Sequence, residues 1–304
     1  MPGKTDKIPT ILLTGFLGAG KTTLLNRLIE HYESTRTVLL INEFGKIGID
    51  GELLVAGNYE KIELNKGSLF CICVRTDFIA EVEKIADEIQ PELLIIEATG
   101  LADTTEMEKM LALPTLIDKI QLQACICLVD CQNFYKIKDN LKAPASQVRS
   151  ADLVLINKID LVTEEQVENT IDAVREMSPA VPILKTKYAE FPLEALADIN
   201  RAAPVETGSP GEGRPDLLKS LTLEAHGSFD QHNWEQFESL VKPIAMRLKG
   251  FIEIDSRMFH IDATAEQWEL RPAENVPASK NRLVLIGQDF DEEKIQSAFL
   301  RLLK

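Results

Sequence analysis

Residues 15–22 read Gly-Phe-Leu-Gly-Ala-Gly-Lys-Thr and satisfy the pattern G-x-x-x-x-G-K-[ST] at every fixed position. The apolar residues 11–14 before this stretch indicate a strand, and residues 23–32 after it have helical spacing. Glycines let the backbone of such a loop turn its N–H groups toward phosphate oxygens at the start of a helix. The sequence therefore predicts a site for the phosphate groups of a nucleotide.

The expected contacts in this loop are main-chain N–H groups, an ammonium group and two hydroxyl groups. Lys21 is expected to reach the β- and γ-phosphates, and the Thr22 hydroxyl is expected to bind Mg²⁺. The whole set of expected nucleotide-binding residues here is Gly15, Gly18, Ala19, Gly20, Lys21, Thr22 and Thr23.

A second motif concerns the base. Residues 153–160 read Leu-Val-Leu-Ile-Asn-Lys-Ile-Asp, which places N-K-x-D directly after an apolar strand. A buried Asp160 carboxylate can accept hydrogen bonds from the N1–H and amino groups of guanine, whereas adenine offers no such pair of donors. Asn157 and Lys158 would hold the loop and cover the base. The motif favours GTP and GDP over adenine nucleotides, although a helix N-cap or a turn uses the same residue types.

A third motif ends another apolar run, residues 92–100, which read Glu-Leu-Leu-Ile-Ile-Glu-Ala-Thr-Gly. Glu97 is expected to bind Mg²⁺ directly or through water, and the Gly100 N–H is expected to sense the γ-phosphate. The alternative is that Glu97 merely ends an edge strand.

Apolar runs alternate with amphipathic segments along residues 1–202, which predicts an α/β P-loop fold. Its mostly parallel sheet would be covered by helices on both faces. Strands are expected at 10–13, 37–41, 93–96, 124–129, 153–156 and 181–184, and helices at 22–32, 77–89 and 163–177.

Residues 203–216 are rich in proline, glycine and polar residues and predict a flexible linker. Residues 217–304 predict a small α+β domain. Its strands are expected at 217–224, 251–254, 258–261, 267–270 and 283–286, with a turn at 255–257 and helices at 233–248 and 292–303.

Composition limits the class of protein. The 304 residues carry 48 acidic and 33 basic side chains, a formal net charge of −15. This charge disfavours nucleic acid or an anionic membrane surface as the main partner. Residues 1–7 lead into a strand-like run without the features of a signal peptide, and five cysteines are too few for a disulfide framework. We therefore expect a cytoplasmic protein with reduced thiols.

Together these motifs resemble the CobW-type branch of the P-loop GTPases, relatives of the UreG and HypB metallocentre-assembly proteins. The likeness rests on residues 14–23, 42–50, 97–103 and 157–162, and on residues 249–251 and 283–287 near the C-terminus. It implies that 42–50 and 97–103 are switch I and switch II. Asp50 and Glu43 would then position Mg²⁺ or the attacking water, unless they belong to an ordinary acidic loop.

The family carries C-x-C-C between the switches, where this chain has Cys71-Ile-Cys73-Val74. With Glu43, the two remaining thiols could bind Zn²⁺, Co²⁺ or copper(I). Val74 in place of the third cysteine, and Lys46 in place of an acid, also leave open that Cys71 and Cys73 are only half-buried residues. Cys125, Cys127 and Cys131 are expected in the core.

The resemblance implies a GTP-hydrolysing, metallochaperone-like switch, slow without a partner, with Lys21, Glu97 and Asp50 as its catalytic residues. It would assist delivery of a metal or corrinoid cofactor to a client metalloenzyme or corrinoid protein, or activation of that client. Members of the group are often dimers, so a homodimer is expected. Two alternatives are a metal-independent, GTP-driven conformational chaperone and a small-molecule kinase.

Overall fold

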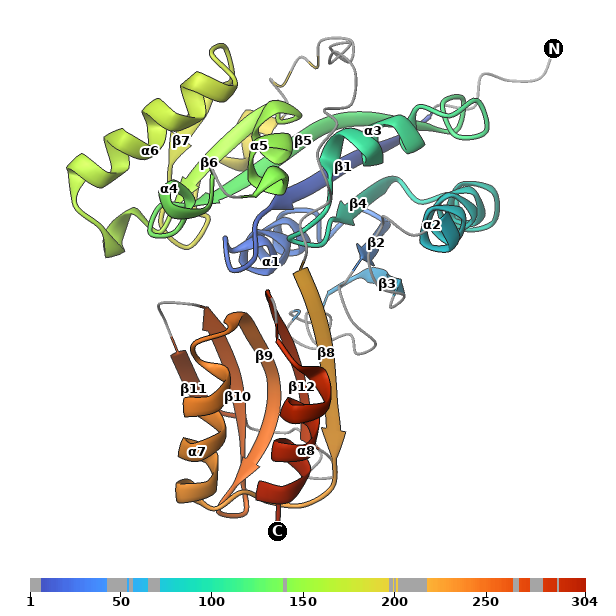
Figure 1. Cartoon of the computed structure of the whole chain (residues 1–304). Helices are drawn as coiled ribbons and strands as arrows, with labels where there is room; N and C mark the ends of the chain where they lie inside the picture. The colour runs from blue at the N-terminus through green and yellow to red at the C-terminus, as the bar shows by residue number, and fades with distance from the viewer. Residues whose placement is uncertain are drawn as a thin grey trace, which may run out of the picture. The chain divides into compact units, whose positions relative to one another are not determined.

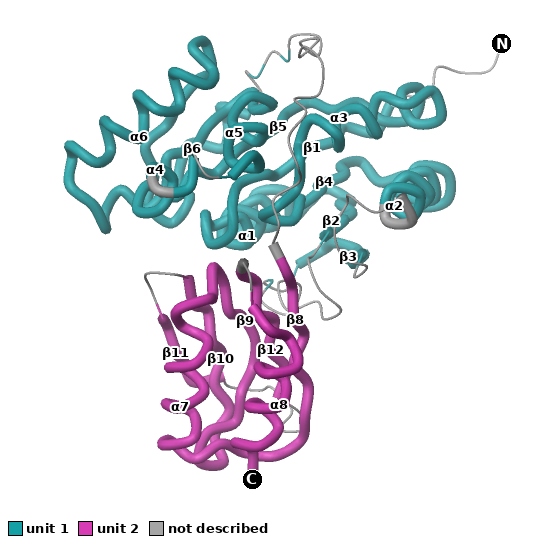
Figure 2. Tube along the Cα trace, in the orientation of Figure 1, with its two compact units in different colours: residues 1–44, 50–216 teal, residues 45–49, 217–304 magenta. Residues whose placement is uncertain are grey.

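A computed structural model describes residues 7–42, 54, 57–64, 72–138, 141–196, 199, 201, 218–264, 268–273, 281–288 and 290–304. Two compact units contain them (Figure 2). The described residues up to 201 belong to the first unit, and those from 218 onward belong to the second.

The first unit is built on a seven-stranded sheet in the order β3-β2-β4-β1-β5-β6-β7, with parallel pairing throughout (Figure 1). Its strands are β1 (Ile8–Gly15), β2 (Thr37–Asn42), β3 (Tyr59–Leu64), β4 (Leu93–Glu97), β5 (Ile120–Asp130), β6 (Leu153–Asn157) and β7 (Ile183–Lys185). Its helices are α1 (Lys21–His31), α2 (Ile72–Lys84), α3 (Thr104–Leu111), α4 (Phe134–Ile137), α5 (Lys142–Arg149) and α6 (Glu164–Met177).

Helices cover both faces of this sheet because successive side chains of its strands point to opposite sides. In β1, Leu12 packs in the core that contains Phe78 of α2 and Met107 of α3. Its neighbour Leu13 packs in a second core with Leu24 of α1. This arrangement confirms the predicted α/β fold with a parallel sheet.

Three details differ from the sequence-based expectation. Strand β3 was not predicted, because this edge strand has only partly buried and exposed residues and lacks an apolar run. The helix expected at 77–89 begins at Ile72 and ends in a π-helical turn, Ile85–Ile89. Strand β4 lies between β2 and β1, so the alternative in which Glu97 ends an edge strand is wrong.

The second unit is a five-stranded antiparallel sheet in the order β11-β10-β9-β12-β8, with two helices packed on one face (Figure 1). The strands are β8 (Leu218–Ala225), β9 (Ala245–Ile254), β10 (Arg257–Thr264), β11 (Trp268–Pro272) and β12 (Asn281–Gln288). The helices are α7 (Gln231–Val241) and α8 (Glu292–Leu302). This confirms the predicted small α+β unit.

The helix expected at 233–248 is wrong in its second half. Helix α7 ends at Val241 and β9 begins at Ala245. Pro243 lies between them, and its ring and missing N–H group prevent continuation of a helix. Strand β9 then turns into β10 at Asp255 and Ser256, both with positive φ, as the predicted turn requires.

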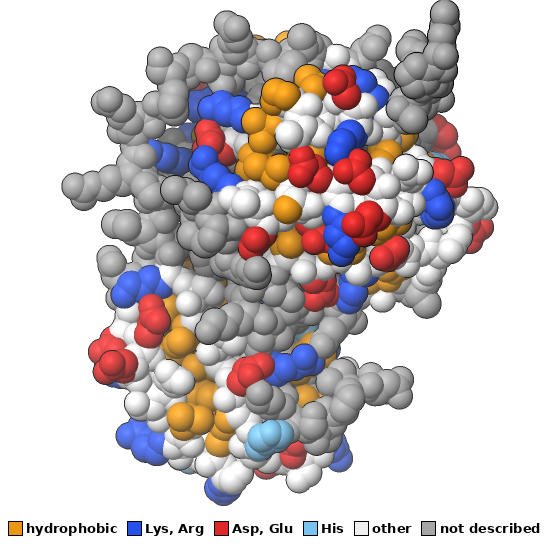
Figure 3. All heavy atoms as spheres, turned by 90° about the vertical axis from the view of Figure 1, so that its right-hand side faces the viewer, with side chains coloured by type: hydrophobic (Ala, Val, Ile, Leu, Met, Phe, Trp, Pro, Cys, Tyr) orange, Lys and Arg blue, Asp and Glu red, His pale blue; other side chains and the backbone are white. Residues whose placement is uncertain are grey.

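Acidic and basic side chains are interspersed over the described part of the face in Figure 3. Among the described residues, every helix is too short or too polar to cross a lipid bilayer.

Candidate functional site

The phosphate-binding motif lies at the carboxyl end of β1 and leads into α1. Gly15, Gly18 and Gly20 have φ angles of 139°, 77° and 107°, a region that other L-residues rarely adopt. A Cβ atom on Gly15 would lie 2.4 Å from the Leu128 carbonyl oxygen of β5. The loop conformation therefore requires glycine at these positions.

Lys21 is the first residue of α1, and its ammonium group lies over the loop. Its Nζ atom donates to the carbonyl oxygens of Gly15, at 2.9 Å, and Phe16, at 3.3 Å. Ala19 is buried, Thr22 is partly buried and Thr23 is exposed. A positive charge and the amino end of a helix thus lie at one loop, an arrangement that favours binding of an anion.

Asn157, at the end of β6, joins the second motif to this loop. Its Nδ2 atom donates to the Ala19 carbonyl oxygen at 2.9 Å. Its Oδ1 atom accepts from the Ala189 N–H at 2.9 Å and from the Thr186 hydroxyl at 3.1 Å. The fold therefore brings the two motifs together, although 138 residues separate Asn157 from Ala19.

Lys158 has a positive φ of 64° and extends along the end of β5. Its Nζ atom lies 3.0 Å from Oδ2 of Asp130, whose side chain is 4% exposed. The Asp130 carboxylate also accepts from the Gln132 N–H and the Asn133 amide, both at 3.0 Å. Asp130 belongs to none of the sequence motifs, and its place at the end of an apolar strand is its only local signal.

Asp160 differs from the expectation of a buried carboxylate. It lies in a single turn of 3₁₀-helix, Ile159–Leu161, and its side chain is exposed. A short turn beyond the end of the strand leaves the carboxylate in water. Water can hydrogen-bond to this carboxylate as long as it stays exposed. Asp160 therefore discriminates against adenine only if the bound base covers the carboxylate and excludes water from it.

Glu97 ends β4 beside the phosphate loop. In the sheet it is aligned with Leu13 of β1 and Ile41 of β2, and its side chain is 4% exposed. Glu97 offers carboxylate oxygens, and Thr22 offers a hydroxyl oxygen. Hard oxygen donors of this kind, next to a phosphate-binding loop, fit Mg²⁺.

The segment that begins at Glu97 packs against the phosphate loop. A Cβ atom on Gly100 would lie 2.7 Å from the Leu17 main-chain nitrogen, so these two backbones are in close contact. Gln147 of α5, which the sequence analysis missed, donates to the Gly100 carbonyl oxygen at 3.0 Å. Gly100 is thus placed beside the phosphate loop.

The expected ligands of a transition metal are not placed. Glu43 and Cys71 lie outside the described residues, and Cys73 is described only as backbone in α2. Asp50, which is expected to be a catalytic residue, also lies outside the described residues. Within the described ranges, no group of three or more His, Cys, Asp or Glu side chains could hold a metal ion.

The remaining cysteines lie in the core, as expected from the sequence. Cys125, Cys127 and Cys131 are buried. Burial raises the pKa of the Cys127 thiol to about 12, against a smaller lowering by Lys21. Burial also raises the pKa values of Cys125 and Cys131. These thiols are therefore protonated at neutral pH and unreactive.

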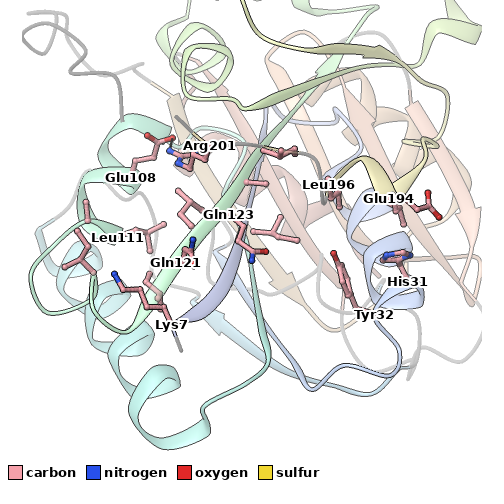
Figure 4. A pocket seen from close by; sticks show the side chains of 18 residues that line it. Lys7, His31, Tyr32, Glu108, Leu111, Gln121, Gln123, Glu194, Leu196 and Arg201 are labelled. Carbon is pink, nitrogen blue, oxygen red and sulfur yellow. Dashed lines mark ion pairs between the residues drawn. The ribbon is translucent and has the colours of Figure 1, made fainter. Parts of the chain in front are cut away.

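A cavity of about 750 Å³ lies elsewhere in the first unit (Figure 4). Lys7, which precedes β1, Gln121 near the start of β5 and Tyr32 just after α1 line it. The cavity lies at the edge of the sheet where the parallel strands begin. The phosphate loop follows the end of β1 and so lies at the opposite edge. The cavity is therefore separate from the candidate nucleotide site.

Comparisons with known proteins cover both units. Residues 9–185 match the nucleotide-binding domain of CobW/HypB/UreG, and residues 218–303 match the cobalamin synthesis protein cobW C-terminal domain. The zinc chaperone CobW of Sinorhizobium sp. is 27% identical, with 98% of each chain covered. The zinc-regulated GTPase metalloprotein activator 1 of Schizosaccharomyces pombe is 31% identical over 88% of this chain and 63% of its own length.

A solved structure, that of the Zn(II)-bound YjiA GTPase from E. coli, is 22% identical, covers 99% of this chain and 100% of its own, and has a TM-score of 0.49. The nucleotide-binding domain match alone spans more than half of the 304 residues. The chain therefore belongs to the CobW/HypB/UreG family of nucleotide-binding proteins.

Proposed function

We propose that this protein binds GTP with Mg²⁺, hydrolyses it to GDP and phosphate, and uses the cycle to supply a metal ion to a client metalloenzyme. The observation that carries the proposal is the 2.9 Å hydrogen bond from Asn157 to Ala19. It joins a base-selecting motif to a phosphate-binding loop, so that one nucleotide can contact both.

In this proposal the phosphate groups are bound by main-chain N–H groups of residues 15–23 and by Lys21. Thr22 and Glu97 hold Mg²⁺, which supplies positive charge to the phosphate oxygens when bound. The N–H group of Gly100 contacts the γ-phosphate. Asp160 accepts from guanine, while Asn157 and Lys158 hold the loop around the base.

For hydrolysis, a water oxygen forms a bond to the γ-phosphorus while the bond from phosphorus to the β–γ bridging oxygen breaks. The electron pair of that bond goes to GDP, and the proton of the water goes to solvent or to phosphate. Lys21 stabilises the charge on the phosphate oxygens. By resemblance, Asp50 or Glu43 orients the water or the metal ion.

The metal cargo is inferred from relatives and from residues outside the described ranges. Two relatives are named a zinc chaperone and a zinc-regulated metalloprotein activator. Cys71 and Cys73, with Glu43, offer this chain two thiolates and a carboxylate, a donor set that suits Zn²⁺ and also Co²⁺. A corrinoid protein is a second possible client.

Two features of the sequence favour a second function, a GTP-driven conformational chaperone that carries no metal. Val74 occupies the position of the family's third cysteine, and Lys46 adds a positive charge to the residues between β2 and β3. Both features would weaken binding of a divalent cation.

Calorimetry with GTP, GDP and ATP, together with phosphate release, tests the nucleotide part. We expect tight guanine-nucleotide binding, weak ATP binding and slow release of phosphate. ATP bound as tightly as GTP, or no binding of either, would contradict the proposal.

Zinc titrations test the metal part. The chain is loaded with GDP or with a non-hydrolysable GTP analogue and compared with Cys71→Ser/Cys73→Ser and with Cys131→Ser, a matched change at a thiol beside Thr170. We expect zinc affinity to depend on the nucleotide and to fall only in the double variant. Equal affinity in all states and variants would favour the metal-independent chaperone.

A further inference from the structure

Helix α5 makes a set of contacts with residues 97–103, the segment that follows β4. Gln147 on this helix is 1% exposed. Its Nε2 atom donates to two main-chain carbonyl oxygens, those of Gly100 at 3.0 Å and Ala102 at 3.3 Å. One buried side chain therefore satisfies two carbonyl groups of a segment that packs without regular secondary structure.

The far end of the same segment is also fixed. The hydroxyl of Ser146, the residue before Gln147, donates to Oδ1 of Asp103 at 2.5 Å. Asp103 caps the start of α3 by accepting from the Thr105 N–H at 3.0 Å. The hydroxyl groups of Thr104 and Thr14 lie 2.9 Å apart, which ties this end to the end of β1, just before the phosphate loop.

These contacts set the orientation of the peptide group between Gly100 and Leu101, which adjoins the peptide group that carries the Gly100 N–H. The carbonyl oxygen of Gly100 is bound by Gln147, and the N–H of Leu101 in the same peptide faces the Thr99 hydroxyl at 3.4 Å. The other side of Gly100 is in contact with Leu17 in the phosphate loop. Gly100 is therefore held between α5 and the loop that would surround the γ-phosphate.

We infer that Gln147 is a positioning residue for GTP, an inference that rests on the proposed function. Its side chain holds residues 100–102 against the phosphate loop, so that the Gly100 N–H meets the γ-phosphate without further ordering of the backbone. Without this hydrogen bond the segment would have to be ordered when GTP binds, at a cost in affinity and rate. GDP has no γ-phosphate and does not use this arrangement.

The test compares Gln147→Leu with Gln121→Leu, the same substitution at an exposed position near the start of β5. We expect Gln147→Leu to weaken binding of a non-hydrolysable GTP analogue and to slow phosphate release, each by at least about tenfold, because both the Gly100 and the Ala102 carbonyl groups lose their donor. GDP affinity should stay within about twofold. The Gln121→Leu variant should match the wild-type chain.

Ser146→Ala is a milder second variant, because it removes one hydroxyl and leaves the buried carbonyl groups satisfied. It should also lower the affinity for the GTP analogue relative to that for GDP, but by a smaller factor than Gln147→Leu does. An equal loss of GDP and analogue binding in the variants would show a merely structural role and overturn the inference, as would no change in either. Failure of the wild-type chain to bind guanine nucleotides would instead contradict the proposed function.

Discussion

The side-chain amide of Asn157 donates a 2.9 Å hydrogen bond to the main-chain carbonyl oxygen of Ala19. The opposite side of the same amide accepts from the Ala189 N–H. A Cβ atom on Gly20 would lie only 2.6 Å from the Asn157 nitrogen, so the fit depends on both residues. One side chain thus sets the distance between the phosphate loop and the loop that would hold the base.

Replacing Asn157 by Asp should weaken GTP and GDP binding to the same degree. The substitution replaces the donor to Ala19 with a carboxylate oxygen, which repels that carbonyl and leaves it unsatisfied. We expect both dissociation constants to rise at least about tenfold and the free energy of unfolding to fall by about 1–3 kcal/mol. Calorimetry and urea unfolding measure these changes. Unchanged GDP affinity would show that the bond does not organise the site.

Replacing Asp160 by Asn should change recognition of the base without changing the stability of the fold. Asp160 is exposed, so the free energy of unfolding should be unchanged. The amide presents a donor where guanine needs a second acceptor, so GDP affinity should fall at least about a hundredfold. The 2-carbonyl of xanthine can accept from the new amide, so xanthosine diphosphate should bind more tightly than GDP. If GDP binds normally, Asp160 does not select the base.

The parts of the site that the sequence predicts have local causes. Glycines at 15, 18 and 20 and Lys21 define the phosphate loop by themselves, because the backbone conformation there suits glycine. The meeting of Asn157 with that loop follows from the parallel sheet, whose strands end at one edge. The apolar runs of β1 and β6 indicate that sheet because both of its faces are buried.

Other features depend on contacts between distant segments and leave no local pattern. Gln147 and Asp130 are ordinary polar residues in the sequence, and their distant partners, Gly100 and Lys158, come next to them only in the folded chain. Strand β3 is half-exposed and resembles a loop. The apolar spacing between Leu240 and Leu248 resembles a helix, although pairing of β9 with β10 and β12 determines a strand.

Loss of Arg201 should destabilise the first unit. Its guanidinium lies 2.9 Å from Glu108 on α3 and 2.5 Å from Asp152 before β6, and all three side chains are mostly buried. Replacing Arg201 by Met leaves two carboxylates together, at a cost of about 3 kcal/mol in the free energy of unfolding. Urea unfolding measures the loss, and Arg27→Met, at an exposed ion pair, is the matched control. Equal stability of both variants would contradict the expectation.

The loss of stability in Arg201→Met should depend on pH. Burial raises the pKa of Glu108, and Arg201 partly offsets this effect. Without Arg201 the pKa should rise further. A carboxyl whose pKa is raised on folding contributes stability below its unfolded pKa, and that contribution is lost as pH rises through the folded pKa. The free energy of unfolding of Arg201→Met should therefore lie closer to that of the wild-type chain at about pH 5 than at about pH 8. A constant deficit would show that Glu108 stays ionised.

The second unit should lose stability in mild acid because of His260. Burial, and then the positive charge of Lys249, lower the pKa of His260 from 6.5 to about 4, while Asp262 opposes the shift and Arg247 and Arg271 add to it. The unfolded chain therefore takes up a proton at higher pH than the folded one. The contribution of His260 to the stability of the folded unit is fully present above about pH 6.5 and is lost as pH falls toward about 4.

Fluorescence can follow this unit selectively, since the chain has two tryptophans, Trp234 and Trp268, and both lie in it. The urea concentration at the unfolding midpoint of the wild-type chain should decrease as the pH is lowered from about 6.5 to about 4. Replacing His260 by Phe, which keeps a ring against Phe251, should flatten that slope. His232→Gln, at an exposed position on α7, is the control and should keep it. Identical slopes for wild type and His260→Phe would mean that groups other than His260 cause the acid sensitivity.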